Sequence, residues 1–364
     1  MTEAEMTVDS RADVLARIEQ WRRRPPRITD DVITMAHGAG GKASQALTDA
    51  VFRSAYGGTE LDRLDDGAVL DVPQGSRLVF TTDAFVVTPR RFSGGSIGDL
   101  AVNGTVNDLA VMGAEPRWLS VSAVLEEGLP LDELREIVAD VAAAAAIAGV
   151  TIVAGDTKVV ERGAADGLFL TTSGIGLLAN DSQLGAEQVK PGDAVIVSGS
   201  LGDHGMAVML ARGDLGLEAD ISSDTAPLHE SVRALLNAVP ETRWMRDPTR
   251  GGLASSCNEL AIAAGVGISL FEENLPVLPA VAGACELLGI DPLYVANEGK
   301  LVAVVPAESA DDAVGALASV EVSANAAVVG AVTDEHAGLV VAHTSFGGSR
   351  IVDMLVGAPL PRIC

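Results

Sequence analysis

The residues best suited to chemistry in this sequence are carboxylates that stand beside small residues in loops and near predicted strand ends. Asp83 closes a predicted strand at 77–83, Asp156 closes another at 150–156, and Asp247 lies in a loop before a helix. Mg²⁺ prefers such oxygen ligands and usually combines one or two carboxylates with phosphate oxygens. The pattern therefore predicts a metal–nucleotide site. Helix caps and solvated turns are the alternative for any one carboxylate, because the chain has 50 acidic residues.

Further polar candidates lie close to these positions. Asp65 and Asp66 occupy the segment "LDDGAVL", and Asp108 shares the predicted helix 96–114 with Asn103. The glycine-rich segment "HGAGGKAS" at 37–44 is not a phosphate-binding loop of the G-x-x-x-x-G-K-[ST] type, because alanine stands at positions 36 and 43. Its backbone N–H groups remain suited to covering phosphates. An ordinary turn is the alternative.

The three cysteines divide into two kinds. Cys257 and Cys285 stand in the apolar helical contexts "SSCNELAIAA" and "AGACELLGI", so we expect them to pack in the interior. Cys364 is the last residue, in "APLPRIC", where a nucleophile would lie on a mobile end. The spacing matches neither a zinc site nor a disulfide framework, which favours a reducing cytoplasm.

Composition and charge limit the possible functions. A chain of 364 residues predicts two domains. Its formal charge of −25 would repel nucleic acid and anionic membranes. The longest apolar run, at 141–150, is too short to span a bilayer, and the polar opening "MTEAEMTVDS" is not a secretory signal. We therefore expect neither nucleic acid nor membrane as a partner.

Alternation of apolar patterns predicts an α/β fold with two layered domains. We expect a flexible leader at 1–30, a first domain at 31–182, a second domain at 188–346 and a flexible tail at 347–364. The remaining predicted strands are at 168–176, within 189–205, and at 267–271, 300–306, 326–332 and 338–343; a glycine-rich exit from the strand within 189–205 leads into a further helix. The remaining predicted helices are at 131–149, 227–238, 252–264, 281–289 and 309–319.

Eight short motifs carry a resemblance to a known family. They are "HGAGG", "DDGAVL", "FTTDAFVVTP", "GDLAVNGTVNDLAVMGAEP", "VAGDTKVV", "RDPTRGGLA", "NEGKLVAVV" and the final "PRIC". From about residue 33 to 364 the sequence resembles the HypE family of hydrogenase-maturation proteins. "NDLAVMGAEP" with "GDTKV" is similar to the wider ATP-binding superfamily of aminoimidazole ribonucleotide synthetase, selenophosphate synthetase and thiamine-monophosphate kinase. The final "PRIC" separates the HypE family from those relatives.

The resemblance implies a fold, a reaction and partners. The fold is the two-domain aminoimidazole ribonucleotide synthetase-like architecture, with an N-terminal ATP-binding domain that pairs in a homodimer. The reaction uses ATP and Mg²⁺ to dehydrate a carbamoyl group on the Cys364 thiol to a thiocyanate, which supplies cyanide to the iron of [NiFe] hydrogenase. HypF would donate the carbamoyl group, and a HypC–HypD complex would accept the cyanide.

The resemblance also implies roles for named residues. Cys364 carries the substrate group, Glu298 in "NEGK" is the favoured general base, and Lys158 in "GDTK" guides the tail or the phosphate. Lys158 is the other candidate for the base, and the alternatives without chemistry are a helix-cap partner for Glu298 and a strand-edge lysine for Lys158. Independently of the resemblance, Arg362 would offset the negative charge beside the thiol, or it would dock the tail onto this acidic protein. Metal ligands would be Asp66, Asp83 and Asp247. Nucleotide-binding residues would be His37, Gly38, Gly40, Gly41, Asp65, Asn103, Asp108, Asp156 and Arg250.

Two other functions are compatible with the same residues. One is a phosphotransferase similar to selenophosphate synthetase or thiamine-monophosphate kinase, which would act on a free small molecule and would not need Cys364. The other is a scaffold without enzymatic activity, in which nucleotide binding controls the docking of partners. ATP turnover by the isolated protein would count against the scaffold.

Overall fold

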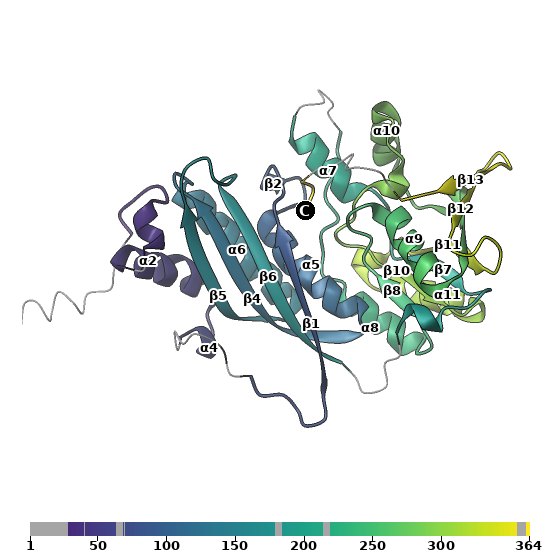
Figure 1. Ribbon diagram of the computed structural model, residues 1–364, viewed down its shortest axis with the longest axis horizontal. Coiled ribbons are helices and arrows are strands. Elements are labelled where there is room, and N and C mark those ends of the chain that lie inside the picture. Colours follow the sequence, from purple (N-terminus) through teal and green to yellow (C-terminus); the bar gives the residue numbers. More distant parts are fainter. Residues whose placement is uncertain are drawn as a thin grey trace, which may run out of the picture.

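A computed structural model describes residues 28–39, 41–62, 68, 70–178, 184–213, 219–354 and 362–364. The predicted leader at 1–30 lies almost entirely outside these ranges. The chain forms two sheets with helices packed against them, so the predicted α/β class is confirmed (Figure 1).

The first sheet has four strands in the order β1-β6-β4-β5. The β4–β5 pair is parallel and the other two pairs are antiparallel. β1 and β5 are therefore the two edges of this sheet. The strands are β1 (Arg77–Phe85), β4 (Ala114–Glu126), β5 (Thr151–Val160) and β6 (Leu168–Leu178), and a short hairpin pairs β2 (Arg91–Phe92) with β3 (Gly95–Ser96).

Two long helices cover one face of this sheet, α5 (Ile97–Val111) and α6 (Leu131–Ala148) (Figure 1). α6 forms where the sequence predicts a helix, because Leu131, Leu134 and Val141 recur on one face and are buried. Gly149 ends it with a φ of 67°, a left-handed conformation that glycine adopts without strain.

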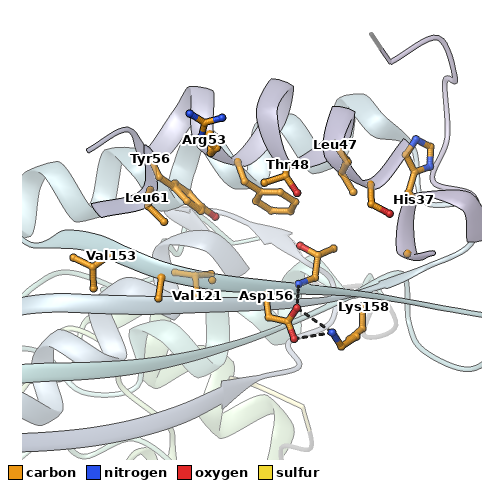
Figure 2. A pocket seen from close by; sticks show the side chains of 16 residues that line it. His37, Leu47, Thr48, Arg53, Tyr56, Leu61, Val121, Val153, Asp156 and Lys158 are labelled. Carbon is orange, nitrogen blue, oxygen red and sulfur yellow. Dashed lines mark hydrogen bonds and ion pairs between the residues drawn. The ribbon is translucent and has the colours of Figure 1, made fainter. Parts of the chain in front are cut away.

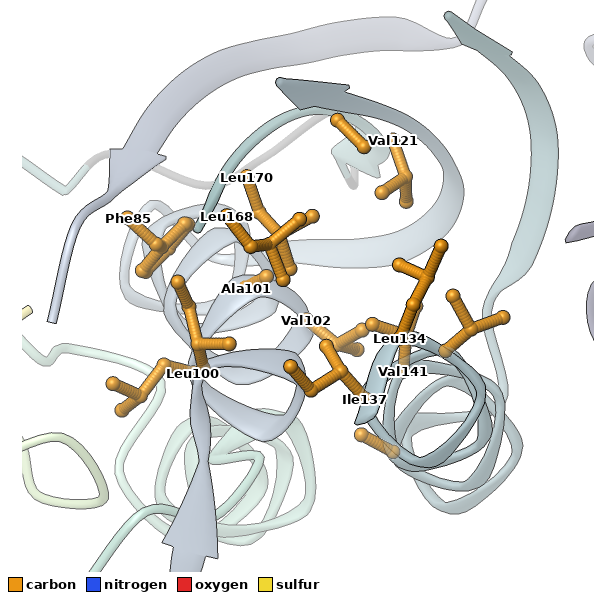
Figure 3. Packing of buried hydrophobic residues seen from close by; sticks show 14 of the residues in the cluster. Phe85, Leu100, Ala101, Val102, Val121, Leu134, Ile137, Val141, Leu168 and Leu170 are labelled. Atoms are coloured by element: carbon orange, nitrogen blue, oxygen red, sulfur yellow. The ribbon is translucent and has the colours of Figure 1, made fainter. Parts of the chain in front are cut away.

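The core of the first domain lies between these helices and the sheet. Val102 of α5 lies toward Leu134 and Ile137 of α6, and Leu168 and Leu170 of β6 lie above α5 on the side of the sheet (Figure 3). Burying each leucine or valine side chain contributes about 1.5–3 kcal/mol. This packing fixes β1 relative to α5, and both elements carry site residues.

A group of short helical segments lies beyond the β5 edge (Figure 1). They are η1 (Met35–Gly38), α2 (Lys42–Leu47), the π-helical η2 (Thr48–Arg53), α3 (Ser54–Tyr56) and α4 (Thr59–Asp62).

The second domain is built on a seven-stranded sheet in the order β13-β12-β9-β11-β7-β10-β8. Its strands are β7 (Ala194–Val197), β8 (Trp244–Arg246), β9 (Gly267–Phe271), β10 (Val302–Val305), β11 (Ala327–Thr333), β12 (Val340–His343) and β13 (Ser349–Val352). Its helices are α7 (Asp203–Ala211), α8 (His229–Ala238), α9 (Gly252–Ala264), α10 (Pro279–Leu288) and α11 (Ala310–Ala318), with short 3-10 turns η3 (Ala186–Gln188), η4 (Glu272–Asn274), η5 (Pro292–Tyr294), η6 (Ala307–Ser309) and η7 (Glu321–Ser323).

The structure corrects three details of the predicted elements. β1 continues two residues past Asp83, and β5 continues to Val160, so Asp156 stands in mid-strand rather than at a strand end. Both segments stay extended because they remain paired with their neighbours. The predicted flexible tail also begins too early. Ser349–Val352 is the edge strand β13, paired with β12, and the Val352 side chain is fully buried.

Candidate active site

The junction between the two domains holds a cavity of about 560 Å³ that is rich in carboxylates. Asp83 from β1, Asp108 from α5, and Asp247 and Arg250 from the loop before α9 line it. Gly252, the first residue of α9, has a φ of 59°, and an added Cβ would lie 2.5 Å from the Leu293 carbonyl oxygen. Glycine therefore lets the end of the "RDPTRGG" segment pack against residues 293–295 of the same domain.

Burial and mutual repulsion raise the pKa values of these carboxylates. Burial raises the pKa of Asp83, and burial together with the Asp83 charge raises that of Asp108. Burial, followed by repulsion from Asp108, raises the pKa of Asp247 to about 7. The positive charge of Arg250 opposes the shift at Asp83. The cavity thus has an excess of negative charge that a cation would relieve.

Glu298 belongs to the same group and is almost completely buried. Its backbone N–H donates to Asp224 Oδ1 over 3.1 Å, and its carbonyl oxygen accepts from Asn107 Nδ2 over 3.0 Å. Its own Oε1 has no hydrogen-bond partner among the described residues. Burial, and then repulsion from Asp247, raises the pKa of Glu298 well above its ordinary value. The backbone is fixed while the carboxyl group stays available to a ligand.

A short link holds the Glu298 segment against the Asp247 loop. Asn297 donates from its backbone and from its side chain to the Pro248 carbonyl oxygen, at 3.2 and 3.0 Å. Asn107 joins α5 to the Glu298 segment and to residues 226–228, since it also donates to the Ala226 carbonyl and accepts from the Leu228 N–H. Elements of both domains therefore position Glu298 and Asp247.

Residues 362–364, which we call the C-terminal segment, lie at this junction. Val86 N–H donates to the Cys364 carbonyl over 3.1 Å, and Thr88 N–H donates to the Arg362 carbonyl over 3.3 Å. The Ile363 side chain is buried in the first domain's core. Burial, then the negative charge of Glu298, raises the pKa of the Cys364 thiol to about 12. The cysteine is thus held close to Glu298 as a neutral thiol.

The expected role of Arg362 at the thiol is not supported by its contacts. Its guanidinium forms an ion pair with Asp166 and donates to the Val86 carbonyl oxygen over 3.3 Å. The positive charge that lowers the pKa of the Cys364 thiol belongs to Arg250. Arg362 instead fastens the C-terminal segment to the first domain.

A second pocket, of about 400 Å³, lies at the β5 edge of the first sheet. His37 and Gly38 of η1 line one side, and Asp156 and Lys158 of β5 line the other (Figure 2). Lys158 Nζ lies 2.9 Å from Asp156 Oδ2, and the hydrogen bond from Lys158 lowers the pKa of Asp156. Both side chains are exposed. The charges of Asp156 and Lys158 are therefore balanced by each other without a ligand.

Local packing also explains the glycine-rich segment. A Cβ on Gly38 would lie 2.7 Å from Val159 Cβ, so glycine permits η1 to rest on β5. Gly41 precedes α2 as its N-cap residue. His37 is buried, and its Nδ1 accepts from the Thr34 N–H over 3.0 Å. These contacts give the segment a packing role besides its predicted phosphate role.

The predicted site residues therefore divide between two regions on opposite edges of one sheet. The junction site comprises Asp83, Asp108, Asp247, Arg250, Glu298 and Cys364. The β5-edge pocket comprises His37, Gly38, Asp156 and Lys158, with Gly41 beside it. The predicted residues Gly40, Asp65 and Asp66 lie outside the described ranges.

Asn103 lies on α5, one helical turn before Asn107. Its Nδ2 donates to Thr225 Oγ1 over 3.1 Å, while its buried Oδ1 has no hydrogen-bond partner within the part of the chain that the structure describes. The side chain thus links the first domain to the 219–228 segment of the second.

The donor set of the junction site is of the kind that holds Mg²⁺. No three histidine, cysteine or acidic side chains among the described residues converge closely enough to bind a metal by themselves. Mg²⁺ commonly takes one or two carboxylates and completes its shell with water and phosphate oxygens. The raised pKa values of Asp83 and Asp247 fit such an incomplete, negatively charged set.

Sequence reasoning missed His204 and Asp224, which shape the junction, and noted Asn107 beside Asp108 without giving it a role. Asn107 carried a usable signal, because "NGTVN" places two asparagines four residues apart on one helix face. Asp224 and His204 gave no such signal, since their partners Glu298 and Ile363 are more than 70 positions away.

Comparison with protein families defines the class of protein first. The N-terminal domain model of AIR synthase related proteins matches residues 64–178, and the C-terminal domain model matches residues 190–342. Thiamine monophosphate kinase from Aquifex aeolicus, at 19% identity and a TM-score of 0.55, shares the fold alone. The predicted aminoimidazole ribonucleotide synthetase-like architecture is confirmed.

Within that class, the chain belongs to the HypE family of carbamoyl dehydratases. It is 52% identical over 340 residues to "Carbamoyl dehydratase HypE" of Rhodobacter capsulatus, covering 93% of this chain and 99% of that protein. It is 45% identical over 336 residues to the Escherichia coli K12 protein of the same name, covering 91% and 99%. The resemblance carried by the eight motifs is thereby confirmed.

Solved structures agree with this assignment. A crystal structure of HypE in complex with ATP has a TM-score of 0.87 and 43% identity, covering 91% of this chain and 99% of that one. The matching chain of a HypE–HypF complex has a TM-score of 0.74 and 45% identity, covering 85% and 100%. Separately, no described helix is long and apolar enough to cross a membrane.

Proposed function

We propose that this chain is an ATP-dependent carbamoyl dehydratase of hydrogenase maturation, and that the thiol of Cys364 carries its substrate group. One observation supports this most directly. The C-terminal segment holds Cys364 at the junction site, where the charges of Glu298 and Asp83 act on its thiol. A cysteine with only a packing role would not need to end among carboxylates. The names of the relatives point to the same reaction.

The substrate group is a thiocarbamate, Cys364–S–C(=O)–NH₂. Its conversion to Cys364–S–C≡N removes the oxygen and both nitrogen-bound protons, which together equal one water. ATP with Mg²⁺ supplies the phosphoryl group that turns the poor oxygen leaving group into a departing phosphate. The sulfur remains bonded to carbon throughout, so the cysteine is both carrier and anchor.

Glu298 is the proposed general base for the nitrogen-bound protons. Its Oε1 is free of partners among the described residues, and its raised pKa makes it a strong proton acceptor once ionised. Repulsion from nearby carboxylates opposes that ionisation. Asp83 and Asp247 would hold the Mg²⁺, and Arg250 adds fixed positive charge beside the thiol.

The β5-edge pocket enters this proposal through a homodimer. Lys158 lies on β5, at the opposite edge of the sheet from β1, which carries Asp83 of the junction site. We therefore do not expect Lys158 to act at the junction site of its own chain. Leu78 and Phe80 are apolar residues of β1 with 54% and 67% exposure, so a second copy has an apolar surface to cover. Pairing the first domains would let Lys158 and the His37–Gly41 segment serve the partner's nucleotide.

The partners follow from the carrier chemistry. A structure of a relative in complex with HypF supports HypF as the donor of the carbamoyl group. A HypC–HypD complex is the proposed acceptor of the cyanide, and the cytoplasm is the proposed compartment. A thiol that serves three sites must leave the junction between reactions.

The test is intact-mass analysis after incubation with the HypF-type partner, carbamoyl phosphate and ATP. We expect one carbamoyl group on the wild-type protein, followed by the loss of one water. Cys364→Ala should gain no carbamoyl mass, whereas the matched control Cys285→Ala, in a buried cysteine, should behave as wild type.

Two results would contradict the proposal. Carbamoylation of Cys364→Ala would exclude the carrier role of that thiol. ATP consumption without any mass change at Cys364 would favour a phosphotransferase that acts on a free small molecule.

A further inference from the structure

His204 is a fully buried histidine at the start of α7 whose two ring nitrogens are both engaged. Its Nε2 lies 2.9 Å from the Ile363 carbonyl oxygen, and its Nδ1 lies 2.8 Å from Ser223 Oγ. The Phe92 ring meets it edge-on, with 5.4 Å between ring centroids. The imidazole therefore has one defined orientation.

The partners of His204 determine its tautomer. A carbonyl oxygen only accepts, so Nε2 must carry the proton that goes to Ile363. Ser223 Oγ already accepts from the Thr225 N–H over 3.2 Å, which leaves its hydroxyl proton for Nδ1. Burial lowers the pKa of His204, in agreement with a neutral ring. The hydrogen bonds from Thr225 to Ser223 and from Ser223 to His204 thus fix the Nε2–H group of His204 as a donor to the C-terminal segment.

The C-terminal segment is held from two sides, one from each domain. The Cys364 carbonyl accepts from the Val86 N–H of the first domain, and the Arg362 carbonyl accepts from the Thr88 N–H of that domain and from Arg212 Nη2 at the end of α7, over 2.9 Å. The Ile363 carbonyl points toward the second domain, where His204 donates to it. Without His204 that buried carbonyl would lose its partner.

We propose that His204 is the positioning residue that docks the C-terminal segment, so that Cys364 is held at the junction site for dehydration. It recognises a backbone carbonyl rather than a side chain. The consequence for dehydration depends on the proposed function, whereas the docking itself does not.

Docking is measured by the rate at which a maleimide labels Cys364 in the native protein without carbamoyl donor, located by mass analysis of the C-terminal peptide. The docked Cys364 is only partly exposed and burial raises the pKa of its thiol to about 12, so labelling should be much faster in the undocked state. Histidine has two partial mimics here. Glutamine places an N–H near the position of Nε2, and asparagine places polar atoms only near that of Nδ1.

We expect His204→Asn to label about tenfold faster than wild type, because a buried carbonyl loses its donor. His204→Gln should stay close to the wild-type rate. Ser223→Ala should label at an intermediate rate, since it removes the group that orients the ring. His229→Asn is the matched control for a histidine-to-asparagine change on another helix, α8, and should leave the rate unchanged.

In protein carbamoylated beforehand, His204→Asn should lose water more slowly than wild type, while His204→Gln should not. Equal labelling of wild type, His204→Asn and Ser223→Ala would overturn the proposal, and so would equal acceleration by the Gln and Asn variants. If labelling follows the expected order but no variant, including wild type, loses water, then the docking inference stands and the proposed function fails.

Discussion

The junction site and the β5-edge pocket differ in how their charged groups are satisfied. At the junction, burial raises the pKa values of Asp83, Asp247 and Glu298, repulsion from neighbouring carboxylates adds to the shift of the last two, and Glu298 Oε1 has no partner among the described residues. At the β5 edge, the exposed Asp156 and Lys158 neutralise each other, and the pKa of Asp156 falls. The unpaired carboxylates therefore destabilise the junction site until a ligand binds there, whereas the charges at the β5 edge are already paired.

This difference indicates which region carries the chemistry. Unpaired buried carboxylates cost stability, so a fold retains them where binding or proton transfer uses them. An exposed ion pair contributes little to stability and opens at little cost. We therefore expect bonds to break at the junction site. In the β5-edge pocket, the Lys158 ammonium group can turn from Asp156 toward a ligand that another part of the protein binds.

The largest expected effect is at the junction, from Glu298→Gln. The amide keeps the shape of the side chain but cannot accept a proton, so dehydration of the carbamoylated protein should slow on the order of 100- to 10,000-fold. Carbamoyl acceptance should persist, because the thiol is untouched. The measurement is single-turnover loss of one water by intact mass. A normal rate would exclude Glu298 as the base and move attention to Lys158.

A second prediction tests whether the two regions meet in a dimer. Lys158→Met and Glu298→Gln should each be impaired alone, and mixing them under conditions that exchange subunits should restore activity. If Lys158 serves the partner's junction site, each mixed dimer has one intact site, so random exchange should return about a quarter of wild-type activity.

The controls for mixing are each variant exchanged with itself, which should stay inactive. Failure to complement in mixtures that demonstrably exchange would show that Lys158 and Glu298 act within one chain, or that Lys158 has no part in the reaction.

Most helices and strands could be predicted from the sequence, because they have clear apolar periodicity. α6 and α9 lie where their patterns predict them. The site was only partly predictable. Asp83, Asp247 and Glu298 were identified by motif, but a motif does not say which sheet edge its residue reaches. Asp156 looked equivalent to Asp83 in sequence, and only the strand order β1-β6-β4-β5 separates them.

The contacts of the C-terminal segment were beyond sequence reasoning for a different reason. Ile363 meets His204 through a backbone carbonyl, and Cys364 meets Val86 through another. Backbone groups are the same at every residue, so no side-chain pattern marks these pairs.

The smallest expected effects are on stability, and they separate the two regions again. Asn107 is buried at the junction and bonds to Ala226, Leu228 and Glu298. Asn107→Ala should lower the free energy of unfolding by about 1–3 kcal/mol, because buried groups lose their partners. Lys158→Met breaks only an exposed ion pair, so it should change that free energy by less than about 1 kcal/mol.

Urea denaturation of both variants beside wild type measures these differences, with circular dichroism as the signal. The small cost expected for Lys158→Met has a direct use, since it lets a loss of activity in that variant be assigned to chemistry rather than to unfolding. A Lys158→Met variant as destabilised as Asn107→Ala would mean that the β5-edge pair supports the fold. The contrast between unpaired charges at the junction site and an ion pair of little structural importance at the β5 edge would then be wrong.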